Sequence, residues 1–506
     1  MRTGTLLRLG LAGSRTDTMR VVLTALSTAL ATLAVLTAAN VVAIGQLTLH
    51  GVGADEWAEQ YSNALLREPG LRPGVVMTLL LLTVPVFALA GQCARLGAPA
   101  RDRRLAAFRL AGATPAQAVA VAAAETGVAS LAGSLSGLAV FLVGHELLHR
   151  PDAEGRLPLP TDVSPPAWFV AVAVLAIPAL AALAAAVVMR RVTVGPFGVV
   201  RRVRRTRGPR PWSGVLIVLG LLAFAAVGSA SPLRVHLRLH VPEWFVPTML
   251  LVGVACAGLG IVIGTGWVTY AAGRLLHRRA RRASTVLAAA RLVADPWSGS
   301  RTLAVLLVCV LFGGGAAALR AQFAAGAEAQ RALDAIENPG FAATSGVDDS
   351  FYLRTLDLVD AALLTAVALT AIAMLVVVAE GVVTRRREYA SLVAAGVPRA
   401  TLGRSMLWQA LLPAVPAILV ALVVGVALIR TIGGEAIAGG GVSMTCDATG
   451  QNCQATEHPK VVRAVPVPWA ELSRDGGVAV LAVLATTGAG LLFLRRSTDL
   501  EEIRAT

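Results

Sequence analysis

The sequence predicts an all-α polytopic membrane protein with about ten transmembrane helices. Of its 506 residues, 56% are hydrophobic and only 15% are charged, and the mean hydropathy is +0.69. This composition is too apolar for a water-soluble protein of this length. The apolar residues also gather in long stretches, and about 20 of them suffice for a helix to cross about 30 Å of hydrocarbon.

The ten expected spans follow one another along the chain without a large polar domain between them. The first follows Arg20 and is longer than the apolar core of a cleavable signal peptide, which has about 7 to 15 residues, so we expect a true span. The expected spans lie near residues 21–46, 74–94, 117–144, 167–189, 212–230, 246–272, 302–323, 358–379, 409–429 and 476–494.

The basic residues indicate how the chain is oriented. With the N-terminus inside, the predicted cytoplasmic segments hold 32 of the 45 lysines and arginines, and the other 13 lie on the outer side, in the loops or at the outer end of a span. This bias predicts a multi-pass protein of a bacterial-type inner membrane with both termini cytoplasmic. The net charge of +15 then reflects membrane orientation and contact with lipid headgroups, so no nucleic acid is expected as a partner.

Two distant segments of the chain resemble each other. Arg101–Pro115 follows the second span and Arg385–Pro398 follows the eighth, and their glycines Gly112 and Gly396 are 284 residues apart. Basic amphipathic segments before the first and seventh spans repeat at a spacing of 281 residues. This near-constant spacing predicts a duplication, and six spans between equivalent points make the two repeats parallel.

The predicted organisation is therefore two parallel four-helix repeats joined by a two-helix linker. Its parts are a cytoplasmic amphipathic segment at 1–20, the first repeat at 21–190, basic linkers and two linker spans at 191–282, the second repeat at 283–496 and a cytoplasmic tail at 497–506.

The duplicated cytoplasmic segment predicts a short helix at the membrane surface. In its second copy, Tyr389, Leu392 and Val393 recur at helical spacing, and charges gather at the beginning. Gly396 is expected to end the helix, because glycine tolerates the left-handed conformation there, and Gly112 has the same expected role in the first copy. An ordinary juxtamembrane helix held by lipid headgroups is the alternative interpretation.

Residues 386–398, Arg-Arg-Glu-Tyr-Ala-Ser-Leu-Val-Ala-Ala-Gly-Val-Pro, and the segment Leu402–Gln409 resemble the signature of the FtsX-like ABC transporter permease family. That family includes MacB-type and lipoprotein-release permeases. The resemblance implies a permease subunit that moves a lipid, peptide or drug-like substrate. It also implies a separate dimeric ABC ATPase at the cytoplasmic face, so that ATP acts through the partner and no cofactor is bound directly.

The resemblance implies that the segment between the second and third helices of each repeat is a coupling helix, which docks on the ATPase. The residues implied for this contact are Arg103, Arg104, Arg109, Gly112, Arg387, Glu388 and Gly396. The copies differ, because Arg104 stands where the second copy has Glu388. Glu125 and Gln409 also correspond, as candidate polar positions inside the membrane. Glu125 has two interpretations, a conformational latch or a helix-end carboxylate near cytoplasmic arginines.

The expected outer loops are short, with the longest at 321–357 and 430–475. The large outer domain of MacB-type members is therefore missing. This leaves a second function class, a membrane scaffold or sensor that regulates an extracytoplasmic partner such as a cell-wall hydrolase without moving solute. Cys446 and Cys453, in the second of these loops, predict a disulfide in an oxidising compartment, with two free thiols as the alternative.

Catalytic motifs are weak or absent in the sequence. The only lysine is Lys460, in an outer loop, so no Walker-type phosphate loop can be present and no enzyme activity is expected. The segment His145–His149 matches the zinc pattern H-E-x-x-H, but no helix offers an obvious third ligand. We therefore expect no catalytic residue and no metal site.

Overall fold

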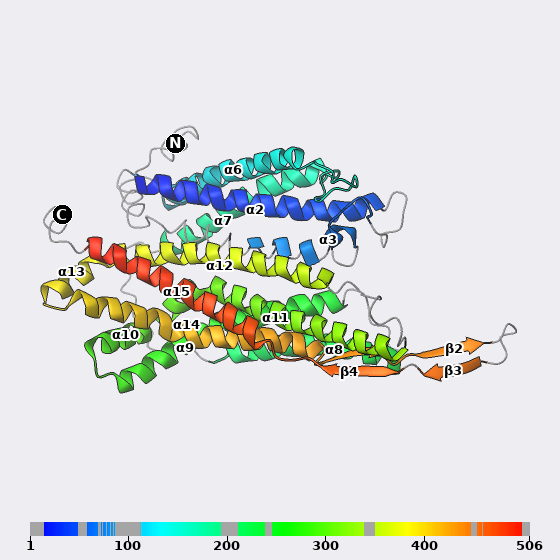
Figure 1. The fold of residues 1–506 in the computed structure, drawn as a ribbon. Coiled ribbons are helices and arrows are strands. Elements are labelled where there is room, and N and C mark those ends of the chain that lie inside the picture. Colours follow the sequence, from blue (N-terminus) through cyan, green and yellow to red (C-terminus); the bar gives the residue numbers. More distant parts are fainter. Residues whose placement is uncertain are drawn as a thin grey trace. The chain divides into compact units, whose positions relative to one another are not determined.

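The computed structural model shows that the protein is built mainly of long α-helices (Figure 1). It describes residues 15–48, 58–68, several positions from 72 to 86, 112, 114–193, 211–237, 245–337, 350–446, 453–457 and 459–497. Within these residues, eight helices are long and apolar enough to cross a membrane. They correspond to the first, third, fourth and sixth to tenth expected spans, so the predicted fold class is confirmed.

The other two expected spans are not among these eight helices. The second, at 74–94, lies largely outside the described residues. The fifth is α8 (Ser213–Leu237), whose apolar stretch Ser213–Ser229 is shorter than the others. The total of ten spans therefore stays a prediction.

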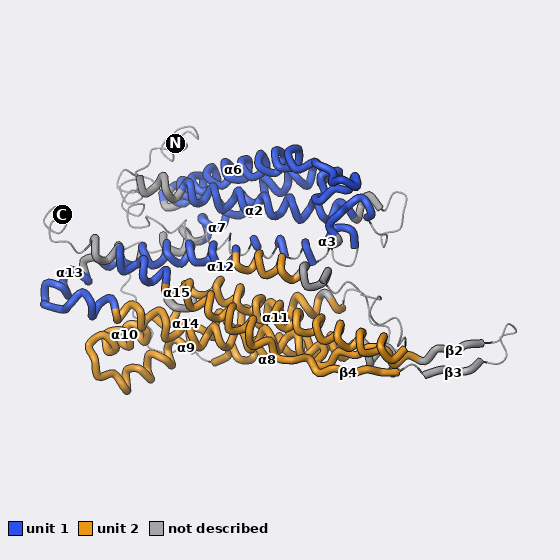
Figure 2. Tube along the Cα trace, in the orientation of Figure 1, with its two compact units in different colours: residues 1–207, 365–403, 485–506 blue, residues 208–364, 404–484 orange. Residues whose placement is uncertain are grey.

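The chain divides into two compact units (Figure 2). Unit 1 consists of residues 1–207, 365–403 and 485–506, and unit 2 of residues 208–364 and 404–484. Three helices contribute residues to both units: α12 (Ser350–Thr384), α14 (Arg399–Ile432) and α15 (Trp469–Ser497). These units are not the predicted sequence repeats, and the repeat boundaries stay a prediction.

Unit 1 is built around three long helices and one short one: α2 (Arg15–Thr48), α6 (Pro115–Leu147), α7 (Ala167–Thr193) and α3 (Ala64–Arg67). Helices α2 and α6 pack closely, because a Cβ atom at Gly133 or Gly137 of α6 would collide with the backbone of α2 at Ala25 or Ala29. Small residues permit such close packing in membranes, where van der Waals contact between helices replaces the hydrophobic effect as a driving force.

Unit 2 contains a larger helical bundle that begins with α8, α9 (Phe245–Arg279), α10 (Ala283–Ala294) and α11 (Trp297–Glu337). Helix α10 is amphipathic, as predicted for the segment before the seventh span, and buries Ser284, Ala288, Ala289 and Leu292 on one face. It packs against α9, where Gly273 leaves room for Leu292.

Helices α11 and α14 also approach each other through glycine. A Cβ atom at Gly425 of α14 would collide with the carbonyl of Leu311, and one at Gly314 of α11 would come close to the carbonyl of Leu422. These are the first and third spans of the second predicted repeat, whereas α2 and α6 hold those positions in the first. Both predicted repeats therefore have the same glycine-mediated helix pair.

The loop after α14 forms a β-ribbon that the sequence analysis did not anticipate. Antiparallel β1 (Glu435–Gly439) pairs with β4 (Lys460–Ala464), and β2 (Val442–Cys446) pairs with β3 (Cys453–Glu457). The strands are short and β1 holds alanine and glycine, which have weak strand preference, so the local pattern is uninformative. Tertiary packing determines where these strands form, because β1 buries its two alanines and both β1 and β4 contact α11.

Candidate functional site

A short helix, α13 (Arg386–Ala394), connects α12 to α14. One side of it is enclosed by protein: Tyr389 is 3% exposed, and Val393 is partly buried. The opposite side presents Glu388 and Ser391 to the surroundings. The structure thus confirms the helix that the spacing predicts, and its exposed side offers a surface on which another protein can bind.

Gly396 ends α13 in the predicted way. Its φ of +87° is left-handed, a conformation that favours glycine. The Gly396 N–H donates to the Val393 carbonyl at 2.9 Å, and the Val397 N–H donates to the Leu392 carbonyl at 3.0 Å. These two bonds form a Schellman motif, which satisfies the last carbonyls of the helix and reverses the chain into α14.

The first predicted repeat also has a left-handed glycine before a long helix. Gly112 has a φ of +91°, and α6 begins at Pro115, three residues later, just as α14 begins at Arg399, three residues after Gly396. Thr114 caps α6, since its Oγ1 accepts from the Gln117 N–H and its own N–H donates to Gln117 Oε1. The two glycines thus share a left-handed conformation and the same distance from the helix that follows.

The other residues implied for the ATPase contact are less fully described. Arg103, Arg104 and Arg109 lie outside the described residues. Arg387 lies in the first turn of α13, beside the exposed Glu388. Among the implied residues that the structure describes, Arg387 and Glu388 lie in α13, Gly396 follows its end, and Gly112 lies before α6. Their role in docking stays a prediction.

The two intramembrane polar candidates lie in different units. Glu125 of α6 belongs to unit 1 and is only 8% exposed, ten residues after the helix begins. Gln409 of α14 belongs to unit 2, and its amide nitrogen is buried without a hydrogen-bond partner. Their correspondence thus rests on the repeat spacing alone.

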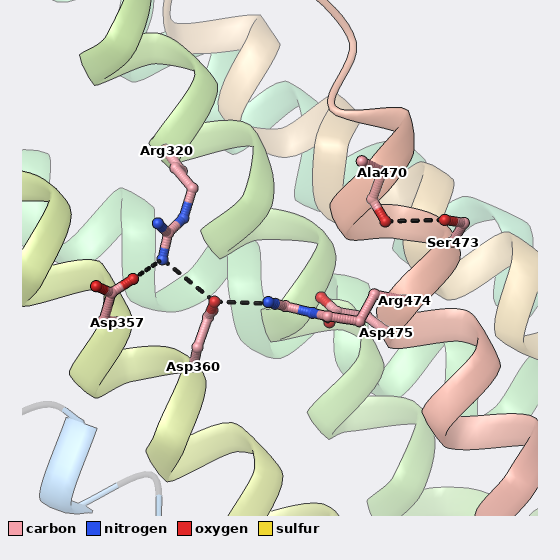
Figure 3. A network of polar contacts seen from close by, with 7 residues as sticks. All are labelled: Arg320, Asp357, Asp360, Ala470, Ser473, Arg474 and Asp475. Carbon is pink, nitrogen blue, oxygen red and sulfur yellow. Dashed lines mark hydrogen bonds and ion pairs between the residues drawn. The ribbon is translucent and has the colours of Figure 1, made fainter.

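A set of ion pairs in unit 2 was missed by the sequence analysis. Asp360 Oδ2 of α12 accepts from Arg320 Nη2 of α11 at 3.2 Å and from Arg474 Nη2 of α15 at 2.9 Å (Figure 3). Arg320 also donates to Asp357 at 2.8 Å, and Arg474 Nε donates to Asp475 at 3.1 Å. We call these five residues the charge clamp, since they join three helices.

A signal for the charge clamp was present in the sequence. Arg320 and Asp360 fall within expected spans, and an ionisable residue in a span is costly unless it is paired or reaches water. Asp357 and Asp360 are three residues apart, which places them on one face of a helix. Pairing these residues with Arg320 would have required the tertiary structure.

A second polar cluster lies outside the spans, in unit 1. The Tyr61 hydroxyl donates to Asp162 Oδ1 at 2.6 Å, and Gln60 Nε2 donates to Asp162 Oδ2 at 3.1 Å. Tyr61 is fully buried, in an apolar cluster that includes Ile44 and Leu66. Burial, and then the bond to Asp162, raises the pKa of the Tyr61 hydroxyl well above its ordinary value of 10.

The predicted disulfide falls at the end of the β2–β3 pair. Cys446 and Cys453 are directly opposite in the antiparallel register. Opposed residues of such a pair have Cα atoms about 4.5 to 5.5 Å apart, within the range that a disulfide spans. The backbone is thus suited to the bond, which stays a prediction.

The two histidines of the H-E-x-x-H match do not lie on one face of a helix. Helix α6 ends at Leu147, so that His145 lies in its last turn and His149 lies beyond it, with Nδ1 2.9 Å from Thr161 Oγ1. Among the described residues, no group of three histidines, cysteines or acids is placed to hold a metal.

Comparison with known proteins gives one family. Residues 361–457 match the FtsX-like permease C-terminal family. No curated protein and no solved structure matches the chain. The matched range includes most of α12, all of α13 and α14, and strands β1 to β3, so it contains both α13 and Gly396. Residues 361–457 are therefore similar to the C-terminal domain of FtsX-like permeases, in a chain whose described part contains eight helices long and apolar enough to cross a membrane.

Proposed function

We propose that this permease subunit receives movement from a separate ATPase at α13 and transmits it across the membrane to export or extract a lipid, peptide or drug-like substrate. The observation that carries the proposal is the connection of α13 to its neighbours. A half-buried helix with an exposed side follows α12 directly and turns into α14 at a left-handed glycine. A force on α13 would therefore act on two long apolar helices.

Helix α12 is suited to transmit such a force. Its 35 residues contain no proline, and at 1.5 Å per residue the helix is about 50 Å long. Proline is a common cause of helix kinks, and α14 contains two prolines inside the helix. We therefore expect α12 to move as a straight element when α13 is displaced.

The helix packing favours transmission of movement over a permanent pore. The α2–α6 and α11–α14 pairs leave no room for a Cβ atom at their contact glycines, so neither contact can hold a solute. The buried Thr32 hydroxyl between α2 and α6 is also hydrogen-bonded: it donates to the Thr28 carbonyl at 2.8 Å and lies 3.1 Å from the Ser134 hydroxyl.

Affinity purification in mild detergent tests the proposal. The wild-type protein should retain a nucleotide-binding subunit, and Gly396→Pro and Glu388→Arg should lose it, because they alter the turn and the exposed side of α13. Glu435→Arg is the matched control, since Glu435 is an exposed acid on the β-ribbon. Absence of any nucleotide-binding partner from the wild type, together with intact function of Gly396→Pro, would refute the proposal.

A membrane scaffold or sensor is the second candidate function. The observation that favours it is the β-ribbon, on which Ile437 and Val462 lie opposite each other with exposed apolar side chains. A photo-crosslinking residue at position 437 would test this function in cells. Capture of one wall-hydrolysing enzyme, with no ATPase in the purified complex, would favour the scaffold over the permease.

A further inference from the structure

The charge clamp joins three helices through one carboxylate. Asp360 Oδ2 on α12 accepts hydrogen bonds from α11, through Arg320, and from α15, through Arg474. Figure 3 shows the Arg320 and Arg474 side chains approaching Asp360 from two sides. Loss of the Asp360 charge would therefore weaken the connections of α12 to both α11 and α15, although Arg320 would keep its bond to Asp357, whereas loss of Asp357 would remove only one bond, from Arg320.

The central groups of the clamp are shielded from solvent. The side chains of Asp360, Asp475 and Arg320 are 17%, 18% and 21% exposed, against 65% for Asp357. Water screens exposed ion pairs strongly and weakens them, whereas a shielded charge that loses its partner is costly. The bonds of Asp360 should therefore constrain the helices more than the bond of Asp357.

A close helix contact supports the clamp on α11. A Cβ atom at Gly313 would lie 3.1 Å from Asp475 Oδ2, so the glycine lets this carboxylate approach the α11 backbone. Gly313 and Arg320 are seven residues apart, which is about two helical turns and places both on one face of α11. Helix α11 thus contacts the clamp at two levels of the same face.

Helix α11 continues from the clamp to the β-ribbon. Beyond Arg320 it buries Ala321, Ala325, Ala329 and Leu333, a stripe with four-residue spacing. This stripe packs against Ala436 and Ala438 of β1, Val461 of β4 and Val465. Displacement of α11 at Arg320 would therefore displace the ribbon with it.

From these contacts we infer that the charge clamp makes α11, the first turns of α12 and α15, and the β-ribbon move as one body. Asp360 is the positioning residue on which this body depends. The inference rests on the proposed function only for the role of this body, which would pass movement of α12 to the β-ribbon. The mechanical connection itself can be measured without an ATPase.

The test is a distance measurement between spin labels at positions 364 and 437 of the full-length protein in lipid nanodiscs. Both native residues, Leu364 and Ile437, are exposed, and the five native cysteines are first replaced. The wild-type clamp should give one narrow distance distribution. Asp360→Asn should add a second, longer component, and Asp360→Glu, which keeps the charge, should restore the single one.

Two further variants keep the inference falsifiable. Arg474→Gln removes the α15 bond from a residue that is 49% exposed, so it reports on the clamp even if Asp360→Asn does not fold. Glu328→Gln, an exposed acid on α11 outside the clamp, is the matched control. Unchanged distributions in both Asp360→Asn and Arg474→Gln, or equal broadening in Glu328→Gln, would overturn the inference. Failure to purify an ATPase would refute only the proposed function.

Discussion

Gly112 and Gly396 lie 284 residues apart and adopt nearly the same left-handed conformation, with φ values of +91° and +87°. Each precedes a long membrane helix by three residues. A side chain in this conformation is strained even where space is free, as it is at both positions. The two glycines thus fix the chain direction at the two candidate ATPase-docking turns.

Gly396→Ala should weaken the α13–α14 turn by about 1 to 2 kcal/mol, the cost of a left-handed conformation for a residue with a Cβ atom. We expect less ATPase in the purified complex and a lower transport rate at an unchanged level of membrane insertion. Gly381→Ala is the control, because Gly381 of α12 has open space around it and no left-handed backbone. If both variants behave like the wild type, the conformation of Gly396 is not needed for coupling.

Gly425→Ala should destabilise the α11–α14 pair, because its Cβ atom would collide with the Leu311 carbonyl. Overpacking of this kind costs about 1 to 3 kcal/mol, which thermal unfolding in detergent can detect. Gly326→Ala on α11 meets nothing within 4 Å and should leave stability unchanged or raise it by about 0.5 to 1 kcal/mol. A lower melting temperature for both variants would contradict the assigned packing.

Tyr61→Phe should remove a hydroxyl whose pKa lies well above the ordinary tyrosine value. The folded-state pKa of Tyr61 is raised by burial and by Asp162, so the stability from this protonated hydroxyl is fully present below pH 10. It is lost as the pH rises from 10 toward the raised pKa, because only the unfolded chain then releases the proton. The absorbance of tyrosinate, followed with rising pH, should show a late contribution that is absent in the variant.

Asp162→Asn separates the two causes of this shift. It keeps burial and removes the negative charge, so the late contribution should move toward lower pH without reaching the ordinary value. Loss of the bond to a charged acceptor should also cost about 1.5 to 3 kcal/mol at neutral pH. An unchanged late contribution in Asp162→Asn would show that this contact does not influence Tyr61.

Local patterns predicted the elements whose causes are local. The spacing of Tyr389, Leu392 and Val393 placed α13, and Gly396 placed its end, since a helix face and its cap depend on neighbours within a few residues. The apolar stretches placed eight spans for the same reason, because bilayer thickness sets their length.

The charge clamp and the β-ribbon could not be predicted in this way. Asp360 is 40 residues from Arg320 and 114 from Arg474, and no local pattern pairs residues at such separations. In β1, the burial of Ala436 and Ala438 depends on the extension of α11 beyond Arg320. Both features are consequences of tertiary packing, which a single sequence does not reveal.

The disulfide between Cys446 and Cys453 is the remaining prediction, and the ribbon register makes it specific. The two residues are directly opposed at the end of β2 and β3, so oxidation would close a short loop at the end of the ribbon. In the chain-entropy description, closing a loop of this size stabilises the folded state by about 2 kcal/mol. Reduction should therefore loosen the β2–β3 pair and increase hydrogen exchange there, while β1 and β4, which pack on α11, stay protected.

Mass spectrometry of unreduced peptides measures the bond itself. The peptide pair containing both cysteines should be two hydrogens lighter than its reduced form and resist alkylation, and Cys446→Ser should make Cys453 reactive. Cys256, a partly buried free thiol, is the internal reference for alkylation. Alkylation of both Cys446 and Cys453 in the unreduced wild type would exclude the bond. The ribbon would then depend on backbone pairing alone at its far end, and its exchange should be equally fast with and without reductant.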